Sequence, residues 1–203
     1  ASSCIYPKDA DHPLKPKTIM SNFLEPTNIS YATAKIAGME LCNAYNAQYG
    51  TKFITAIPSD YFGPEDNFNS ENSHVISALI AKIYHAKINN TKNVKIWGSG
   101  KPIRDFIYID DLASAMIFVM KNYKSKYPIN ITSCNYLSIK EIANMIKKII
   151  GFEGRLQYDT LKPDGMLIKT LDNSSISKLG WKSSFTFNKA LKYTYKSYKK
   201  TLL

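Results

Sequence analysis

The chain is short of arginine, of cysteine and of long apolar runs. Only Arg104 and Arg155 among its 27 basic residues are arginine and the lysines are scattered, so we expect no nucleic-acid surface despite a net charge of +11. Cys4, Cys42 and Cys134 are odd in number and far apart, which predicts reduced thiols in a cytoplasmic protein rather than disulfides. The sequence also offers no membrane-spanning run and no His or Cys cluster with metal-site spacing.

Signals at the start of the chain are missing as well. The chain opens on Ala1-Ser-Ser-Cys, with neither an initiator methionine nor a secretion signal. No G-x-G-x-x-G turn follows a predicted strand, so the usual pyrophosphate-binding turn of a dinucleotide fold is not in the sequence. What is present is enough apolar material, 44% of 203 residues, to bury a core in one large domain.

Apolar spacing alternates between helical and strand-like segments, which predicts an α/β fold with a parallel sheet and crossover helices. We expect helices at 30–49, 75–88, 110–121, 138–150 and 187–198, and strands at 52–57, 94–97, 105–109 and 129–131. The first helix should bury Ala34, Ala37, Gly38, Leu41, Cys42 and Tyr45 and stop at Gly50. The polar segment 59–72 is expected to be a functional loop.

Tyr31 and Lys35 form a candidate acid–base pair. They are four residues apart in a predicted helix, so they project from one face about one turn apart. A nearby ammonium group favours the phenolate, which suits tyrosine to proton transfer. The same spacing also occurs on ordinary amphipathic helices, so the pair alone leaves both interpretations open.

Several segments, taken in their order along the chain, resemble the GDP-L-fucose synthase family of the extended short-chain dehydrogenase/reductases. They are Ser2-Ser-Cys-Ile-Tyr-Pro-Lys8, Leu24-Glu-Pro-Thr-Asn28, Tyr31-x-x-x-Lys35, Gly63-Pro-x-Asp-Asn-Phe68, Glu71-Asn-Ser-His-Val-Ile76, Trp97-Gly-x-Gly100, Arg104-Asp-Phe106 and Lys162-Pro-Asp-Gly165. The resemblance implies NADPH-dependent 3,5-epimerisation and 4-reduction of GDP-4-keto-6-deoxymannose to GDP-L-fucose.

The resemblance also implies how the chain is organised. Residues 1–68 would be the C-terminal part of an NADP-binding Rossmann domain, and residues 69–203 mainly a small α/β substrate-binding subdomain with some segments returning to the Rossmann sheet. The first strands and the glycine-rich turn of that domain are absent from the chain. We therefore expect a fragment, or a decayed relic, that does not hold NADPH tightly alone; the complete protein would be a homodimer.

The same resemblance implies catalytic roles. Tyr31 would protonate the C4 oxygen, Ser2 would give it a second hydrogen bond, and Lys35 would favour the phenolate and hold the nicotinamide ribose. Cys4 and His74 would exchange the C3 and C5 protons, since a thiol and an imidazole both titrate near neutral pH. Taken singly, Cys4 could be a small buried residue, His74 a local helix-end contact and Ser2 a turn residue.

The resemblance further implies the binding positions. NADP(H) would contact Ser2, Ser3, Tyr31, Lys35, Pro58, Ser59, Asp60, Tyr61 and His74, and the GDP-sugar would contact Lys82, Trp97, Arg104 and Asp164. From spacing alone, Trp97 is instead expected to pack in a core.

Three positions depart from the family pattern. Asp60 stands where an amide faces the cofactor, Ile168 stands where an arginine is usual, and Thr132-Ser-Cys134 replaces Gly-Thr-Gly. Two rival functions therefore remain: another NAD(P)-dependent nucleotide-sugar epimerase or dehydratase, and a non-catalytic remnant that binds a sugar nucleotide.

Overall fold

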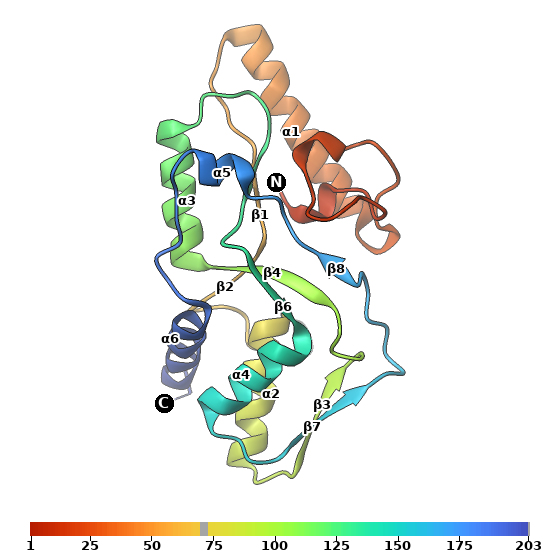
Figure 1. Cartoon of the computed structure of the whole chain (residues 1–203), viewed down its shortest axis with the longest axis vertical. Helices are drawn as coiled ribbons and strands as arrows, with labels where there is room; N and C mark the ends of the chain where they lie inside the picture. Colours follow the sequence, from red (N-terminus) through yellow and green to blue (C-terminus); the bar gives the residue numbers. More distant parts are fainter. Residues whose placement is uncertain (70–72, 203) are drawn as a thin grey trace. The chain divides into compact units, whose positions relative to one another are not determined.

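The computed structural model describes residues 1–69 and 73–202. Within it the chain passes back and forth between two compact units (Figure 1). Unit 1 consists of Ala1–Tyr61, Asp105–Asn135 and Lys169–Ser183; unit 2 consists of Phe62–Arg104, Tyr136–Ile168 and Ser184–Leu203, apart from the residues that are not described. Helices and parallel strand pairs occur together, so the expected α/β class is confirmed.

Unit 1 is built on a short parallel strand pair. Its helices are α1 (Ile29–Tyr49), α3 (Ile109–Asn122) and α5 (Ser174–Lys178), its 3-10 helices η1 (Ser3–Ile5), η2 (Pro16–Thr18) and η3 (Pro26–Asn28), and its paired strands β1 (Ala56–Pro58) and β5 (Ile129–Ile131). Ala56 lies opposite Ile129 in the pair. Both α3 and α5 pack against β5. The apolar cluster there includes Ala115 and Trp181, whose indole N–H donates to the Ser114 hydroxyl at 3.2 Å.

Helix α1 corrects one sequence expectation. It ends at Gly50 as predicted, with this glycine in the left-handed conformation at φ 65°. Its buried residues, however, are Ala32 and Met39, and none of the six predicted ones is buried. The elements that pack most closely on α1 are η1 and η3, each of which is only three residues long. The remaining apolar side chains, such as Leu41 at 58% exposure, therefore stay at the surface of unit 1.

Unit 2 combines three helices with a second parallel strand pair. They are α2 (Val75–Ile88), α4 (Ile139–Ile150), α6 (Phe187–Lys200), β3 (Asn93–Trp97) and β7 (Arg155–Asp159). Helix α4 packs on both α2 and α6. It begins with the predicted capping box, in which the Ser138 hydroxyl accepts from the Glu141 N–H and the Glu141 carboxylate accepts from the Ser138 N–H.

Four of the five places where the chain passes from one unit to the other lie within strands, and the fifth lies between Ser183 and Ser184. The four strands are β2 (Asp60–Phe62), β4 (Ile103–Tyr108), β6 (Asn135–Ser138) and β8 (Ile168–Lys169). Segment 59–72 was predicted to be a loop throughout, and this is wrong in part, because β2 occupies Asp60–Phe62. Residues 70–72 of that segment, which include Glu71 and Asn72 of the family-like motif, lie outside the described residues.

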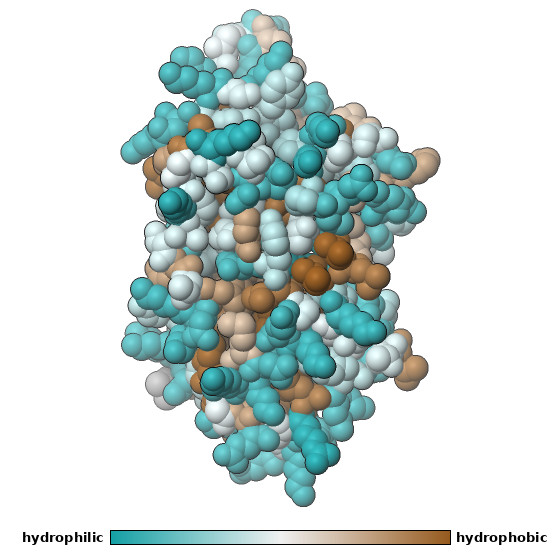
Figure 2. Space-filling model, in the orientation of Figure 1, coloured by the Kyte–Doolittle hydropathy of each residue, from teal (hydrophilic) through white to brown (hydrophobic). Residues whose placement is uncertain are grey.

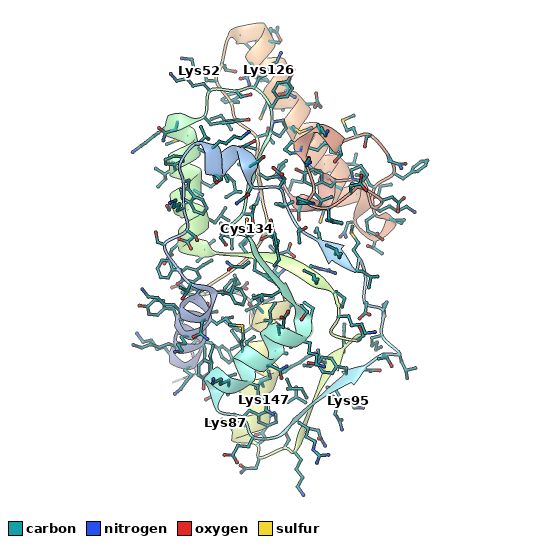
Figure 3. The ribbon with its side chains drawn as sticks, in the orientation of Figure 1. Lys52, Lys87, Lys95, Lys126, Cys134 and Lys147 are labelled. Atoms are coloured by element: carbon teal, nitrogen blue, oxygen red, sulfur yellow. The ribbon has the colours of Figure 1, made fainter. Side chains whose placement is uncertain are left out.

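The face drawn in Figure 2 mixes hydrophilic and apolar side chains. Hydrophilic side chains cover most of the face drawn in Figure 2, with apolar side chains between them. Lysines are spread over elements of both units, as the labelled Lys52, Lys87, Lys95, Lys126 and Lys147 show (Figure 3). Across residues 1–69 and 73–202, no helix has the length and apolarity to cross a membrane.

Candidate active site

One apolar cluster in unit 1 positions most of the predicted catalytic and cofactor residues. Its buried members are Ile5, Tyr6, Leu14, Met39, Ile57 and Leu171. Each predicted segment adjoins one of them: Ser2–Cys4 precedes Ile5, Pro58–Tyr61 follows Ile57, and α1 carries Met39. Packing of these large side chains fixes the backbone from which the polar site residues extend.

The Ser2–Cys4 segment is held between β1 and α1. The Ala1 amino group donates to the Ala56 carbonyl at 2.7 Å, which places the segment beside β1. The Ser2 hydroxyl then accepts from the Cys4 N–H at 3.3 Å and caps η1, which packs on α1. Ser2 therefore does act as a turn residue. A hydroxyl can accept one bond and donate another, so capping does not exclude the predicted catalytic role.

Tyr31 and Lys35 lie next to one another on α1, as their spacing predicts. The Lys35 Nζ is 5.3 Å from the centroid of the Tyr31 ring. Tyr31 is half exposed, so its phenol is accessible in unit 1. The neighbouring cation and the accessible hydroxyl are what an acid for a developing alkoxide requires.

The predicted cofactor residues Pro58–Tyr61 extend from the last residue of β1 into β2. The Ser59 N–H donates to the Ile131 carbonyl at 2.9 Å, and Ser59 is buried. The Asp60 side chain is 41% exposed and lies 4.0 Å from the ammonium group of Lys169. Tyr61 is half exposed.

Lys169 lies beside two predicted site residues, although the sequence interpretation did not single it out. Its ammonium group lies 3.7 Å from the Cys4 sulfur as well as 4.0 Å from Asp60. A signal was available, because Lys169 directly follows Ile168 in the stretch where the resembled family has Arg-Lys. Its proximity to Cys4 was not predicted, because 165 residues separate the two in the sequence.

Asp105 is a second residue that sequence reasoning did not assign to the site. Its carboxylate accepts from the Thr132 hydroxyl at 2.7 Å and from the Leu171 N–H at 3.2 Å. Burial, with a smaller contribution from the negative charge of Asp60, raises the pKa of Asp105 to about 7, although the two hydrogen bonds act in the opposite direction. Asp105, Asp60 and Lys169 line the same small cavity.

His74 belongs to unit 2. It is the N-cap residue of α2, is exposed, and its carbonyl accepts from the Ala78 N–H at 2.9 Å. Its backbone therefore has the helix-end role considered from sequence. Cys4 lies in unit 1, so the cooperation of Cys4 with His74 stays a prediction.

Trp97 lies on the exposed face of β3. Val94 and Ile96 are buried, whereas Trp97 is 61% exposed, so its expected placement in a core is wrong. Strand alternation explains this, because Trp97 falls on the outward side. The ammonium groups of Lys82 and Lys162 lie 5.1 and 5.6 Å from its ring centroid. An exposed aromatic face with two cations beside it suits a ligand that has both a flat ring and negative charge.

Asp164 holds the turn that follows Trp97, and Arg104 holds the backbone at Met166. The Asp164 carboxylate accepts from the Ser99 N–H at 2.6 Å and from the Ser99 hydroxyl at 2.7 Å, and these bonds lower the pKa of Asp164. Arg104 donates to the Met166 carbonyl at 2.7 Å. In unit 2, Asp164 is therefore bonded to the turn after Trp97, and Arg104 is bonded two residues after Asp164.

Replacing Gly98 with alanine should destabilise unit 2 by about 3 kcal/mol. Gly98 has φ +77°, and an added Cβ would lie 2.2 Å from the Asp164 carboxylate, so the bonds to Ser99 would be lost in addition to the backbone strain. Gly50→Ala is the matched control, because Gly50 has φ +65° with nothing within 4 Å, and should cost only about 1 kcal/mol. Urea unfolding measures both; equal losses would mean that the Asp164 contact contributes nothing.

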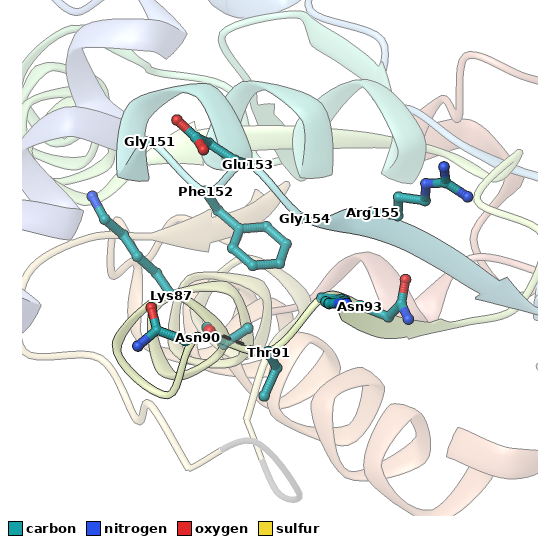
Figure 4. Close-up of a pocket in the computed structure, with 11 residues that line it drawn as sticks. Lys87, Asn90, Thr91, Asn93, Gly151, Phe152, Glu153, Gly154 and Arg155 are labelled. Carbon is teal, nitrogen blue, oxygen red and sulfur yellow. Dashed lines mark hydrogen bonds between the residues drawn. The ribbon is translucent and has the colours of Figure 1, made fainter.

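Two larger cavities lie apart from the predicted residues. One of about 840 Å³ in unit 2 lies between the turn after α2 and the turn after α4, where Lys87, Asn90 and Phe152 line it (Figure 4). Another of about 920 Å³ in unit 1 is lined by the C-terminal parts of α1 and α3 and by the residues that follow them. None of the predicted site residues lines either cavity. Over the described part of the chain, no cluster of His, Cys, Asp or Glu could hold a metal ion.

Comparison with known proteins identifies relatives of this chain. Residues 1–132 match the model of the NAD dependent epimerase/dehydratase family. The chain is 46% identical over 197 residues to a probable GDP-L-fucose synthase 1 of Oryza sativa, covering 97% of this chain and 60% of that protein. It is 41% identical to GDP-L-fucose synthase of Escherichia coli, covering 96% and 63%. The chain thus spans about 60% of the length of these curated relatives, and the resemblance found in the sequence is confirmed.

Solved structures show the same likeness. A GDP-L-fucose synthetase from Naegleria fowleri bound to NADP matches with a TM-score of 0.93 at 32% identity, over 99% of this chain and 65% of that one. A GDP-6-OMe-4-keto-L-xylo-heptose reductase from C. jejuni matches with a TM-score of 0.91 at 34% identity, over 99% and 69%.

Proposed function

The chain belongs to the NAD dependent epimerase/dehydratase family, and we propose that it is part of an enzyme that converts GDP-4-keto-6-deoxymannose to GDP-L-fucose with NADPH. One structural observation carries this proposal. The Tyr31–Lys35 pair lies on α1, and η1, which contains Cys4 and is capped by Ser2, packs on the same helix. The groups proposed for ketone reduction, and one of the two proposed for proton exchange, are therefore supported by one element.

In the reduction, Tyr31 donates its phenolic proton to the C4 oxygen as negative charge develops there. The ammonium group of Lys35, 5.3 Å from the centroid of the Tyr31 ring, supplies a positive charge beside the donor. Ser2 supplies a second hydrogen bond to the same oxygen.

In the epimerisation, Cys4 and His74 act on opposite faces of the sugar. The Cys4 thiolate takes the acidic proton next to the ketone, and His74 returns a proton from the opposite side. We assign these roles to a thiol in unit 1 and an imidazole in unit 2.

The residues of unit 1 fit the nicotinamide end of NADP(H), with Ser3, Pro58, Ser59, Asp60 and Tyr61 completing the contacts. When bound, the cofactor supplies the hydride for C4. The carboxylate of Asp60 does not disfavour this assignment, because the ammonium group of Lys169 lies 4.0 Å away and offsets its charge. The sequence has no glycine-rich turn for the pyrophosphate, which we assign to an amino-terminal part of the protein.

The substrate end of the site lies in unit 2. We propose that Trp97 stacks on the guanine, that Lys82 and Arg104 contact the diphosphate, and that Asp164 holds the turn beside them. We assign cofactor binding mainly to residues 1–68 and substrate binding mainly to residues 69–203. We further propose that the protein is a homodimer. We also propose a cytoplasmic location, in keeping with Cys4, Cys42 and Cys134 being outside any disulfide.

A fusion protein tests the function. The amino-terminal part of the Escherichia coli relative is joined ahead of Ala1, and NADPH oxidation is followed with GDP-4-keto-6-deoxymannose. The fusion should turn over this substrate and leave the corresponding UDP- and dTDP-sugars unreduced, whereas the chain alone should bind NADPH weakly and show no reduction. Equal turnover of UDP-sugars would support a different nucleotide-sugar enzyme, and a well-folded fusion that binds a GDP-sugar without any turnover would support a non-catalytic module.

Replacing Cys4 with serine should suppress proton exchange without removing C4 reduction. The thiolate is the proton acceptor in the proposal, and a serine hydroxyl is a far weaker acid near neutral pH. In the fusion protein, exchange of the C3 and C5 protons with deuterated solvent should fall by about 10²-fold or more. Cys42→Ser, on α1, is the matched control and should exchange normally. Normal exchange in the Cys4 variant would leave Cys4 a structural residue only.

A further inference from the structure

Three charged or ionisable side chains meet around Lys169 in unit 1. The Lys169 Nζ lies 3.7 Å from the Cys4 sulfur and 4.0 Å from a carboxylate oxygen of Asp60. The Lys169 side chain is only 17% exposed. The carboxyl groups of Asp60 and Asp105 line the small cavity beside it, so these are the charged or titratable groups that face the ammonium group there.

We propose that Lys169 is a positioning residue for Cys4, holding the sulfur by a hydrogen bond that favours the thiolate, and that Asp60 weakens this effect by competing for the same ammonium group. This inference rests on the proposed role of Cys4 in epimerisation. It adds a residue that the family-like motifs did not assign and explains what an acidic residue at position 60 does in this chain.

The backbone on both sides of the contact is fixed. The Leu14 N–H donates to the Thr170 carbonyl at 2.8 Å, and the Thr170 N–H donates to the His12 ring at 3.3 Å. Leu171 is buried in the same apolar cluster as Ile5, which directly follows Cys4. Both partners are therefore anchored one or two residues from the contact, which limits the entropy lost when the long lysine side chain is held near the sulfur.

The ammonium group suits the needs of a thiol that must transfer protons. A charge-assisted hydrogen bond favours the ionised acceptor, so Lys169 favours the sulfur anion that takes a proton from the sugar carbon. That proton moves to the Cys4 sulfur, the electron pair of the C–H bond becomes the enolate, and Lys169 keeps its own protons throughout. Asp60 is 41% exposed, so its competing attraction for Lys169 is weakened by solvent.

The test is the rate at which Cys4 is alkylated by iodoacetamide at pH 7. Mass analysis of the peptide that contains Cys4 separates its rate from those of Cys42 and Cys134. Lys169→Met should slow alkylation of Cys4 by about tenfold, the effect expected of one charge-assisted hydrogen bond. Lys169→Arg should retain most of the rate. Lys178→Met, an exposed lysine on α5, is the matched control and should leave the rate unchanged.

A second variant tests the part assigned to Asp60. Asp60→Asn removes the competing charge and should speed alkylation of Cys4 by about twofold. Circular dichroism and thermal unfolding establish that each variant is folded. A folded Lys169→Met protein that reacts at the normal rate, or an Asp60→Asn protein that reacts more slowly, would overturn the proposal. Because no substrate or cofactor is present, this result is independent of whether the proposed reaction is correct.

Discussion

Replacing Tyr31 with phenylalanine is expected to lower NADPH oxidation in the fusion protein by about 10²–10⁴-fold, the usual contribution of a general acid. The substitution removes only the phenolic oxygen, so the aromatic ring that lies 5.3 Å from the Lys35 ammonium group remains. Substrate affinity should change little, because the lost hydrogen bond is needed mainly when charge develops on the C4 oxygen. Steady-state kinetics with GDP-4-keto-6-deoxymannose measure both quantities.

Tyr49→Phe is the matched control for this prediction. Tyr49 lies on the same helix, is 63% exposed, and its ring contacts that of Tyr45. Tyr49→Phe therefore removes the same phenolic hydroxyl as Tyr31→Phe, from a similarly exposed side chain. The control should oxidise NADPH at the normal rate. If the Tyr31 variant did so too, Tyr31 would not be the proton donor, whereas a loss in both variants would indicate damage to α1.

Local features of this site were predictable from the sequence. Tyr31 and Lys35 are one helical turn apart, so their proximity follows from helix geometry once the helix is identified. The bounds of α2 and the capping box of α4 were predicted for the same reason, since a helical period and a cap are written in neighbouring residues.

Features that depend on distant packing were not predictable. Lys169 reaches Cys4 only because Leu171 and Ile5 enter one apolar cluster, and no local pattern records that meeting. The buried side of α1 was predicted wrongly because apolar residues such as Leu41 lie on more than one side of it, and burial depends on what packs there. Strand β7 was not predicted, because its five residues include the charged Arg155 and Asp159 and only a weak alternation.

Asp105 makes the stability of the protein depend on pH in an unusual direction. Its folded-state pKa of about 7 lies above the unfolded value of about 3.9, so between these values the native state holds a proton that the unfolded state has lost. Stability contributed by this proton therefore falls as pH rises from about 4 to 7, by about 1.4 kcal/mol per pH unit and about 4 kcal/mol in all. Above pH 7 the full cost of a buried carboxylate remains.

Asp105→Asn should remove this dependence. An amide stays neutral, its oxygen can accept from the Leu171 N–H, and its NH₂ group can donate to the Thr132 hydroxyl, so both hydrogen bonds have an equivalent. The variant should match the original protein near pH 4 and exceed its free energy of unfolding by up to about 4 kcal/mol at pH 8. Urea unfolding at several pH values gives the comparison.

Asp110→Asn serves as the control for the charge change alone. Asp110 is exposed in the first turn of α3, so its replacement should change stability by less than about 1 kcal/mol, with no comparable dependence on pH. A stability difference between the Asp105 variant and the original protein that is constant from pH 4 to 8 would show that Asp105 titrates at its ordinary pKa. It would also show that the Thr132 and Leu171 bonds offset the effect of burial. A difference that grows with pH would instead establish that unit 1 keeps a protonated carboxyl group beside Asp60 and Lys169 up to neutral pH.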